Sequence, residues 1–240
     1  MSNHNQQKTD TADLRTAQVT FIPPPTVAHF YSNFTTQYCA IMSPVGLGKT
    51  TALILKALRI SRRQMPDENG VRWTRHAFVR GTYQQLVDST VKSFEDWVPS
   101  HICKLKKSAP INGQIDMLPL HDQDQLFVPG SLLGGTYNAE TGERMGAEDV
   151  SGKRIGDYFP NGTYMHTDFR FMALDSQNAI GDLRSTEYTC MFFDEPDQMD
   201  SLEDVLTEAQ TRIGRYPSAK RISLTCSVVR IQDLPPIMAD

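Results

Sequence analysis

The chain has 240 residues, enough for one large domain or for a domain with an appendage. Its 39% hydrophobic and 22% charged residues are typical of a globular protein, and a formal net charge of −4 excludes a chain that attracts nucleic acid over its whole surface. No stretch is long or apolar enough to cross a bilayer, and the four cysteines, which lack metal-ligand spacing, fit a reducing cytoplasm.

The first part of the chain predicts a tail and then a short helix. Residues 1–20 are polar and rich in Asn, Gln and Thr, so we expect a flexible N-terminal tail before a domain over residues 21–240. The prolines at 23–25 fix an extended approach, and residues 27–31 then predict a turn or helix. Phe30 and Tyr31 are candidates to sit beside an adenine base, and the alternative is that both pack in the core.

A glycine-rich loop between an apolar strand and a helix is the strongest signal in the sequence. Residues 38–42 predict a buried strand and residues 51–60 a helix. Glycines let backbone N–H groups converge on phosphate oxygens, and Lys49 supplies a mobile cation. The Thr50 hydroxyl would complete the coordination shell of a phosphate-bound Mg²⁺. The residues expected to bind ATP are Ser43, Pro44, Val45, Gly46, Leu47, Gly48, Lys49, Thr50 and Thr51.

One position departs from the usual loop pattern, which opens with glycine where this chain has Ser43. A glycine there often takes a backbone conformation that serine reaches only at a cost of roughly 1 kcal/mol or more. A damaged or coincidental loop is therefore an alternative interpretation. The intact Gly48, Lys49 and Thr50, with a strand before them and a helix after them, favour a working loop.

The middle of the chain continues the alternation of strands and helices. Residues 75–80 predict a second strand, and residues 82–98 an amphipathic helix that ends before Pro99. Residues 104–161 have weak periodicity and many Gly, Pro, Asp and Gln, so we expect a loop-rich insertion that holds at most a small β-meander. A strand over 169–174 and a short helix over 179–184 follow.

A second motif, Met-Phe-Phe-Asp-Glu at residues 191–195, ends another apolar strand. Asp194 can hold magnesium through water, and Glu195 can polarise an attacking water as a catalytic base. A helix that opens at Ser201 and a strand over 221–229 follow. Together the two motifs make ATP hydrolysis the leading hypothesis.

The order of elements predicts an α/β fold with a mostly parallel sheet flanked by helices. The strand over 75–80 falls between the two motif strands in sequence. That position suits the additional-strand, catalytic-glutamate branch of the P-loop ATPases.

Further segments occur in a characteristic order. They are FIPPPTVAHFY at 21–31, the glycine-rich loop, and residues 78–83, 171–175, 185–189 and 212–218, the last ahead of a strand with Thr225. This ordered set, which spans most of residues 21–230, resembles the ATPase domain of the large terminase subunit, the DNA-packaging motor of tailed bacteriophages. Many ATPases share the loop and the carboxylate motif, whereas Gly-Arg-Tyr-Pro-Ser at 214–218 is much more specific.

The resemblance implies further roles. Thr225 would lie in the coupling motif, which senses the γ-phosphate and links hydrolysis to movement. An arginine in such rings often reaches a neighbouring subunit's nucleotide and stabilises transition-state charge. Arg184 is the preferred candidate, and Arg212 and Arg215 are the others; solvated charge near a helix C-terminus is the alternative for these two. Arg80 would instead stabilise the site within its own chain.

The resemblance also implies partners. They are double-stranded DNA, a portal protein, a small terminase subunit and further copies of this chain in a ring on the procapsid, in the cytoplasm of an infected bacterial host. We expect the isolated chain to be mostly monomeric. Large terminases carry a C-terminal nuclease domain, and we expect no nuclease activity from this chain, which stops at Asp240.

Two other functions stay open. One is a nucleotide-binding scaffold or regulator, and the other is a different DNA-dependent P-loop ATPase or helicase. Two basic clusters could touch DNA phosphates or be solvated faces. These clusters are Arg59, Arg62 and Arg63, and Lys104, Lys106 and Lys107.

Overall fold

The computed structural model describes residues 21–33, 39–44, 46–64, 66–67, 69–108, 110–120, 127–128, 136–137, 144–145, 153–154, 159–174, 181, 183–199, 202–216 and 228–233. The tail expected over 1–20, Val45 of the loop and Thr225 lie outside these residues, as does most of the strand expected over 221–229. Among the described helices, none combines the length and the apolar character that a membrane span requires.

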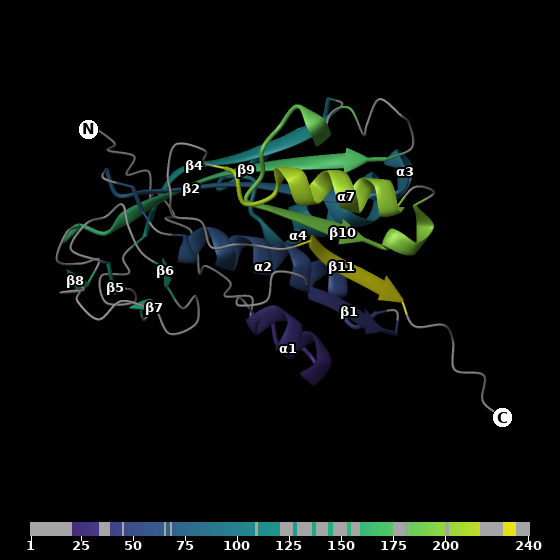
Figure 1. Cartoon of the computed structure of the whole chain (residues 1–240), viewed down its shortest axis with the longest axis horizontal. Helices are drawn as coiled ribbons and strands as arrows, with labels where there is room; N and C mark the ends of the chain where they lie inside the picture. Colours follow the sequence, from purple (N-terminus) through teal and green to yellow (C-terminus); the bar gives the residue numbers. More distant parts are fainter. Residues whose placement is uncertain are drawn as a thin grey trace, which may run out of the picture.

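A seven-stranded sheet forms the centre of the fold, in the order β1-β11-β10-β2-β9-β4-β3 (Figure 1). The first five strands of that order run parallel, and the last two pair antiparallel. The predicted α/β fold with a mostly parallel sheet is therefore confirmed. The strands are β1 Cys39–Ser43, β2 Val71–Arg80, β3 Lys104–Lys106, β4 Ile111–Leu120, β9 Thr163–Ala173, β10 Cys190–Asp194 and β11 Val228–Asp233.

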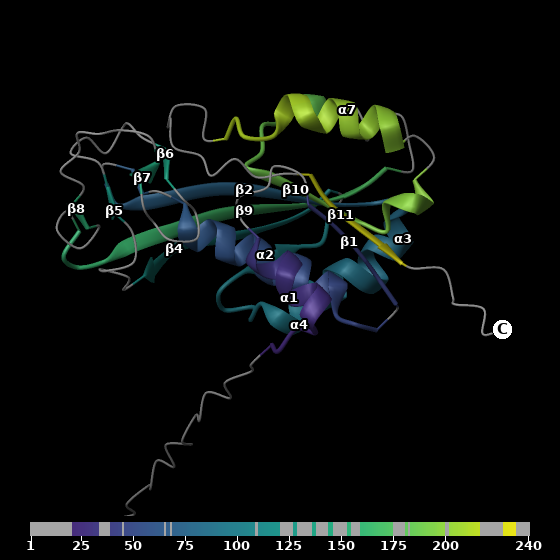
Figure 2. The ribbon, with the colours of Figure 1, turned by 60° about the horizontal axis from the view of Figure 1, so that its bottom comes forward.

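Helices cover both faces of the sheet (Figure 2). On one face, α1 Pro25–Ser32 and α2 Lys49–Arg63 pack with a helix over residues 83–97, which consists of α3 Tyr83–Gln85, the π-helical η1 Leu86–Val91 and α4 Lys92–Trp97. On the other face lies α7 Leu202–Arg212, after the short 3-10 turn η2 Pro196–Gln198. Apolar side chains at helical spacing explain this arrangement, because each helix buries one stripe against the sheet.

The strand that lies between the two motif strands in space is not the one that lies between them in sequence. In space, β11 lies between β1 and β10, whereas β2, which contains the predicted strand over 75–80, pairs with the far side of β10. The order of the strands in the sheet therefore differs from their order in the chain. Sequence order does not fix sheet order, because a crossover connection can place a later strand between two earlier ones.

The predicted loop-rich insertion over 104–161 is wrong for its first part. Residues 104–106 and 111–120 are β3 and β4, which extend the main sheet by antiparallel pairing with β9. A bulge between Ile115 and Leu118, with Met117 at φ 49°, interrupts the alternation of buried and exposed residues and hides the strand from a periodicity search. Further along, β5 Phe127–Val128 pairs with β8 Lys153–Arg154, and β6 Thr136–Tyr137 with β7 Arg144–Met145.

Candidate active site

The two sequence motifs meet at the carboxyl edge of the sheet. The strands β1 and β10 both pair with β11, so their ends lie about 10 Å apart. The loop after β1 and the carboxylate at the end of β10 close this gap, since the Thr50 hydroxyl donates to Asp194 Oδ1 at 3.2 Å. Residues 144 positions apart in the chain thus share one site.

The glycine-rich loop leads into the N-terminus of α2. Gly48 is the N-cap residue, with φ 75° in the left-handed region that favours glycine. Lys49 is buried, and its ammonium donates to the carbonyl oxygens of Ser43 at 2.8 Å and Pro44 at 2.9 Å. The lysine side chain therefore folds back onto its own loop. Its charge and the N-terminal N–H groups of α2, which have no side-chain cap, would together favour an anion at this position.

Ser43 does not carry the backbone cost that its place in the motif suggested. It is the last residue of β1, in register with Asp233 of β11. The non-glycine residues with positive φ in the described part of the chain are Met117 and Glu195, so Ser43 is not one of them. Serine is compatible with this loop because the first position of the motif is ordinary strand backbone here.

Asp194 is the most heavily bonded carboxylate of the site. It is 2% exposed, and its Oδ2 accepts from Thr90 Oγ1 at 2.7 Å and from Arg80 at 2.9 Å. These two donors fix Oδ2, while Oδ1 faces Thr50. Arg80 lies where the resemblance implied, whereas no motif in the sequence points to Thr90.

Thr90 reaches Asp194 because of a local irregularity in its helix. Residues 86–91 are π-helical, with an i→i+5 pattern that inserts one residue per turn relative to an α-helix. Thr90 is fully buried in this segment, and it also lies 3.5 Å from the Arg80 guanidinium. An α-helix turns by about 100° per residue. Without the inserted residue, position 90 would therefore be rotated by about 100° about the helix axis, and Thr90 would not face Asp194.

Glu195 follows the end of β10 in a strained conformation. Its φ of 52° and ψ of 59° lie in the left-handed region, at a cost of roughly 1 kcal/mol or more for a side chain other than glycine. The Arg80 guanidinium forms an ion pair with the Glu195 carboxylate as well as with Asp194. One arginine on β2 thus holds both acidic residues of the motif.

Gly81, which follows Arg80, allows the turn after Glu195 to lie close to β2. A Cβ atom at position 81 would lie 2.9 Å from the backbone oxygen of Gln198, closer than such contacts normally come. The Gln85 side chain donates to the Gln198 side chain at 2.7 Å and links the same turn to the helix. The turn that carries Glu195 is therefore packed directly against the end of β2.

The donor set fits a small hard cation. Thr50 Oγ1 and Asp194 Oδ1 are oxygens 3.2 Å apart. Neighbouring oxygen ligands of octahedral Mg²⁺ lie about 3 Å apart for a ligand distance of about 2.1 Å. Thr50 and Asp194 are the residues that would hold Mg²⁺, which would neutralise phosphate charge when bound.

The arginines proposed to reach a neighbouring subunit lie away from this edge. Arg184 Nε donates to Glu208 of α7 at 3.1 Å, and Arg212 lies 3.5 Å from the same carboxylate. The Arg212 carbonyl accepts from the N–H of Tyr188, which precedes β10 and is six residues, or roughly 20 Å, from Asp194. Arg215 is exposed. These side chains do not join the site of their own chain.

Of the two aromatic residues suggested for adenine, Phe30 packs in the core, which was the alternative for it, and Tyr31 packs edge to face on Phe21 with 6.0 Å between the ring centroids. Phe30 is 4% exposed, and the Lys56 ammonium lies 4.3 Å from its ring centroid. Tyr31 packs under Arg59, with 4.4 Å between the guanidinium carbon and the ring centroid. The ring that does reach the loop belongs to Phe21, which would lie 3.3 Å from a Cβ atom at Gly48.

Comparisons with known proteins give distant similarities. No family model matches the chain, and no curated protein matches it. The chain is similar to solved structures of the large terminase from a thermophilic bacteriophage. One has 10% identity and a TM-score of 0.47, and the match covers 84% of this chain and 34% of that chain. Another, in complex with ADP, has 10% identity and a TM-score of 0.46, covering 86% and 34%. The chain thus spans about a third of the length of these structures.

Proposed function

We propose that this chain is an ATP-hydrolysing motor domain that drives translocation of double-stranded viral DNA into a procapsid. The observation that carries the ATPase part is the convergence of Lys49 and Thr50 with Asp194 at one sheet edge. The ordered segments over 21–230 that resemble the large terminase support the motor part. The position of β11 between β1 and β10 supports assignment to the additional-strand, catalytic-glutamate type of P-loop ATPase.

The residues of the chain suggest how hydrolysis would proceed. The ammonium of Lys49 would leave the carbonyls of Ser43 and Pro44 for the phosphates of ATP, with the N-terminus of α2 as the second source of positive charge. Glu195 would accept a hydrogen bond from the attacking water and remove its proton. It must first exchange its ion pair with Arg80 for that water. The guanidinium, still bound to Asp194, would then face the developing charge from within the chain.

A ring of copies would complete the site. Arg184 is paired with Glu208 at a side-chain exposure of 64%, so a neighbouring copy can reach it at little cost. An arginine supplied in this way can accelerate hydrolysis by roughly 10³–10⁵. We therefore propose a homo-oligomeric ring that docks on a portal protein, with a small terminase subunit as a further partner and a weakly active monomer in isolation.

Steady-state ATP turnover of the wild-type chain tests this proposal, alone and with double-stranded DNA and assembled portal, and with Lys49→Ala as the inactive control. Weak turnover that DNA or portal stimulates supports a packaging motor. Turnover that single-stranded nucleic acid stimulates equally well supports another ATPase or helicase. Nucleotide binding without turnover under any of these conditions supports a scaffold or regulator and contradicts the proposal.

A further inference from the structure

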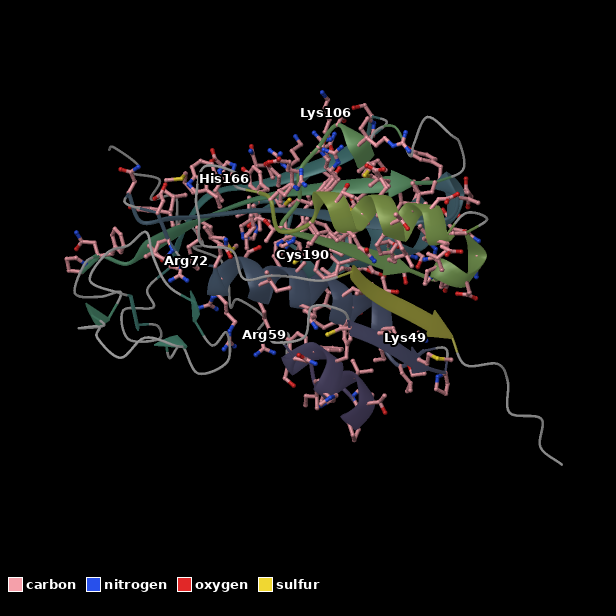
Figure 3. All side chains as sticks on the ribbon, viewed as in Figure 1. Lys49, Arg59, Arg72, Lys106, His166 and Cys190 are labelled. Carbon is pink, nitrogen blue, oxygen red and sulfur yellow. The ribbon has the colours of Figure 1, made fainter. Side chains whose placement is uncertain are left out.

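A hollow of about 330 Å³ lies on the face of the sheet, away from the loop and its carboxylates. We call it the sheet-face hollow. The charged and amide side chains that determine its chemistry come from four strands. They are Arg75, Lys104, Lys106, Gln114, Asp168 and Arg170. Figure 3 shows Lys106 at the outer edge of the sheet, far from Lys49.

The hollow exists because α7 covers only part of its side of the sheet. Its apolar residues pack on Ala77 and Val79 of β2 and on Met172 near the end of β9. Beyond that cluster, the alternating residues on the same side of β9, β4 and β3 are polar and at least partly exposed. Figure 2 shows α7 and α2 on opposite faces of the sheet. The described part of the chain thus leaves a charged area of sheet open.

The single acidic residue of the hollow is already neutralised. Arg75 donates to Asp168 Oδ2 from Nε at 3.1 Å and from a terminal nitrogen at 3.0 Å. Gln114 donates to Asp168 Oδ1 at 3.0 Å. Both carboxylate oxygens therefore have partners within the sheet. An incoming cation finds no open carboxylate among these described residues, and the remaining charge of the hollow is positive.

Two of the four cations are fixed in place. The Arg75 guanidinium lies 4.0 Å from the centroid of the Tyr216 ring, so Asp168 and Tyr216 hold it from two sides. Arg170 donates to the Thr186 hydroxyl at 2.9 Å through one of its five N–H groups. Pre-positioned arginines bind phosphate oxygens with less loss of side-chain entropy than free ones do.

The two lysines add flexible charge at the rim. Lys104 and Lys106 are exposed, and they project from the same side of β3 because side chains alternate along a strand. Lys107, the next residue, is different: its ammonium lies 2.9 Å from the Glu95 carboxylate. The sequence cluster of three lysines therefore divides into two that face the hollow and one with a carboxylate partner.

We propose that the sheet-face hollow binds the phosphodiester backbone of double-stranded DNA. The cations come from strands about 4.8 Å apart and do not converge on one point, which suits successive phosphates better than one small anion. Backbone binding of this kind is independent of base sequence, as a translocating protein requires. The inference rests on the proposed function, because that function supplies DNA as the polyanion.

Fluorescence anisotropy with a short labelled duplex tests the inference in the absence of ATP. The double variant Lys104→Gln/Lys106→Gln should bind the duplex at least about tenfold more weakly at low salt than the wild type does. Its slope of log affinity against log salt should be smaller by about 1.8, at ~0.9 per lost phosphate contact. Lys107→Gln, which removes the same charge from the same segment, should stay within about twofold of the wild type. Both changes are at exposed positions, so the fold should tolerate them.

Competitors at matched ionic strength identify the ligand class. Equal duplex binding by the double variant and the wild type overturns the inference. Displacement of the duplex by inorganic phosphate alone overturns it in favour of a small-anion site, and equally strong displacement by polyglutamate overturns it in favour of an acidic protein segment. ATP turnover without DNA separates this inference from the proposed function. Unchanged ATP turnover in both lysine variants supports a DNA site that is separate from the site of hydrolysis. If the wild-type chain hydrolyses ATP but binds no duplex, the DNA site is overturned and the proposed ATPase activity stands.

Discussion

Replacing Thr90 with valine removes one hydrogen bond from Asp194 while keeping the shape of the side chain. The bond is the shortest that Asp194 receives, 2.7 Å from Thr90 Oγ1 to Oδ2, and both residues are almost inaccessible to water. A hydrogen bond to a charged group contributes roughly 1.5–3 kcal/mol. Arg80 remains on the same oxygen. We therefore expect the free energy of unfolding to fall by about 1.5–3 kcal/mol in Thr90→Val.

Part of this loss should appear at the proposed Mg²⁺ site. Without the hydrogen bond from Thr90, the Asp194 carboxylate can rotate away from Thr50. If Mg²⁺ binding becomes weaker by about 1 kcal/mol as a result, the Mg²⁺ midpoint for nucleotide binding rises about fivefold. A Mg²⁺ titration with a fluorescent ATP analogue measures the midpoint, and calorimetry measures stability. Thr90→Ser, which keeps the hydroxyl, should keep the wild-type Mg²⁺ midpoint.

Thr74→Val is the matched control for Thr90→Val. Thr74 is also fully buried, and its hydroxyl bonds neutral partners, Ser61 at 2.8 Å and Thr167 at 2.9 Å. This control should lose stability without a change in the Mg²⁺ midpoint. If Thr90→Val loses stability and keeps the wild-type midpoint, Thr90 has only a structural role and the reasoning fails.

Three further changes test other parts of the site. Lys49→Ala should abolish tight ATP binding, because backbone N–H groups alone do not neutralise the β- and γ-phosphates; unchanged affinity in a titration removes Lys49 from the site. Gly81→Ala should displace the turn at Gln198 and lower stability by roughly 1–3 kcal/mol, and a melting temperature equal to the wild type contradicts the close contact. Mixing Arg184→Ala subunits with Lys49→Ala subunits on assembled portal should restore part of the ATP turnover. If this mixture stays inactive, and Arg212→Ala or Arg215→Ala subunits do restore turnover when mixed with Lys49→Ala subunits, the trans arginine lies after β10.

Local chemistry made the two motifs predictable from the sequence. Gly48, Lys49 and Thr50 are consecutive residues at the start of α2, and Asp194 ends a run of apolar residues. The structure places both motifs at one edge because the carboxyl ends of parallel strands share it. Neighbouring residues in the chain carry this information, so a search along the sequence finds it.

Contacts across the fold were not predictable in the same way. Thr90 is 104 residues from Asp194, and its orientation depends on a π-helical segment that apolar spacing does not reveal. The packing of Phe30 against Lys56 depends on how α1 crosses α2. Ser43 looked costly only because the motif was compared with glycine, whereas strand pairing sets its backbone.

We propose that the site hydrolyses ATP with Glu195 as the base, and a change at Glu195 tests this most directly. Glu195→Gln keeps the size of the side chain and removes its charge, so it separates binding from chemistry. We expect nucleotide affinity close to the wild type, and a rate of phosphate release in a single turnover, with portal and DNA present, that is lower by about 10²–10⁴. Equal phosphate release by Glu195→Gln and the wild type would contradict the account.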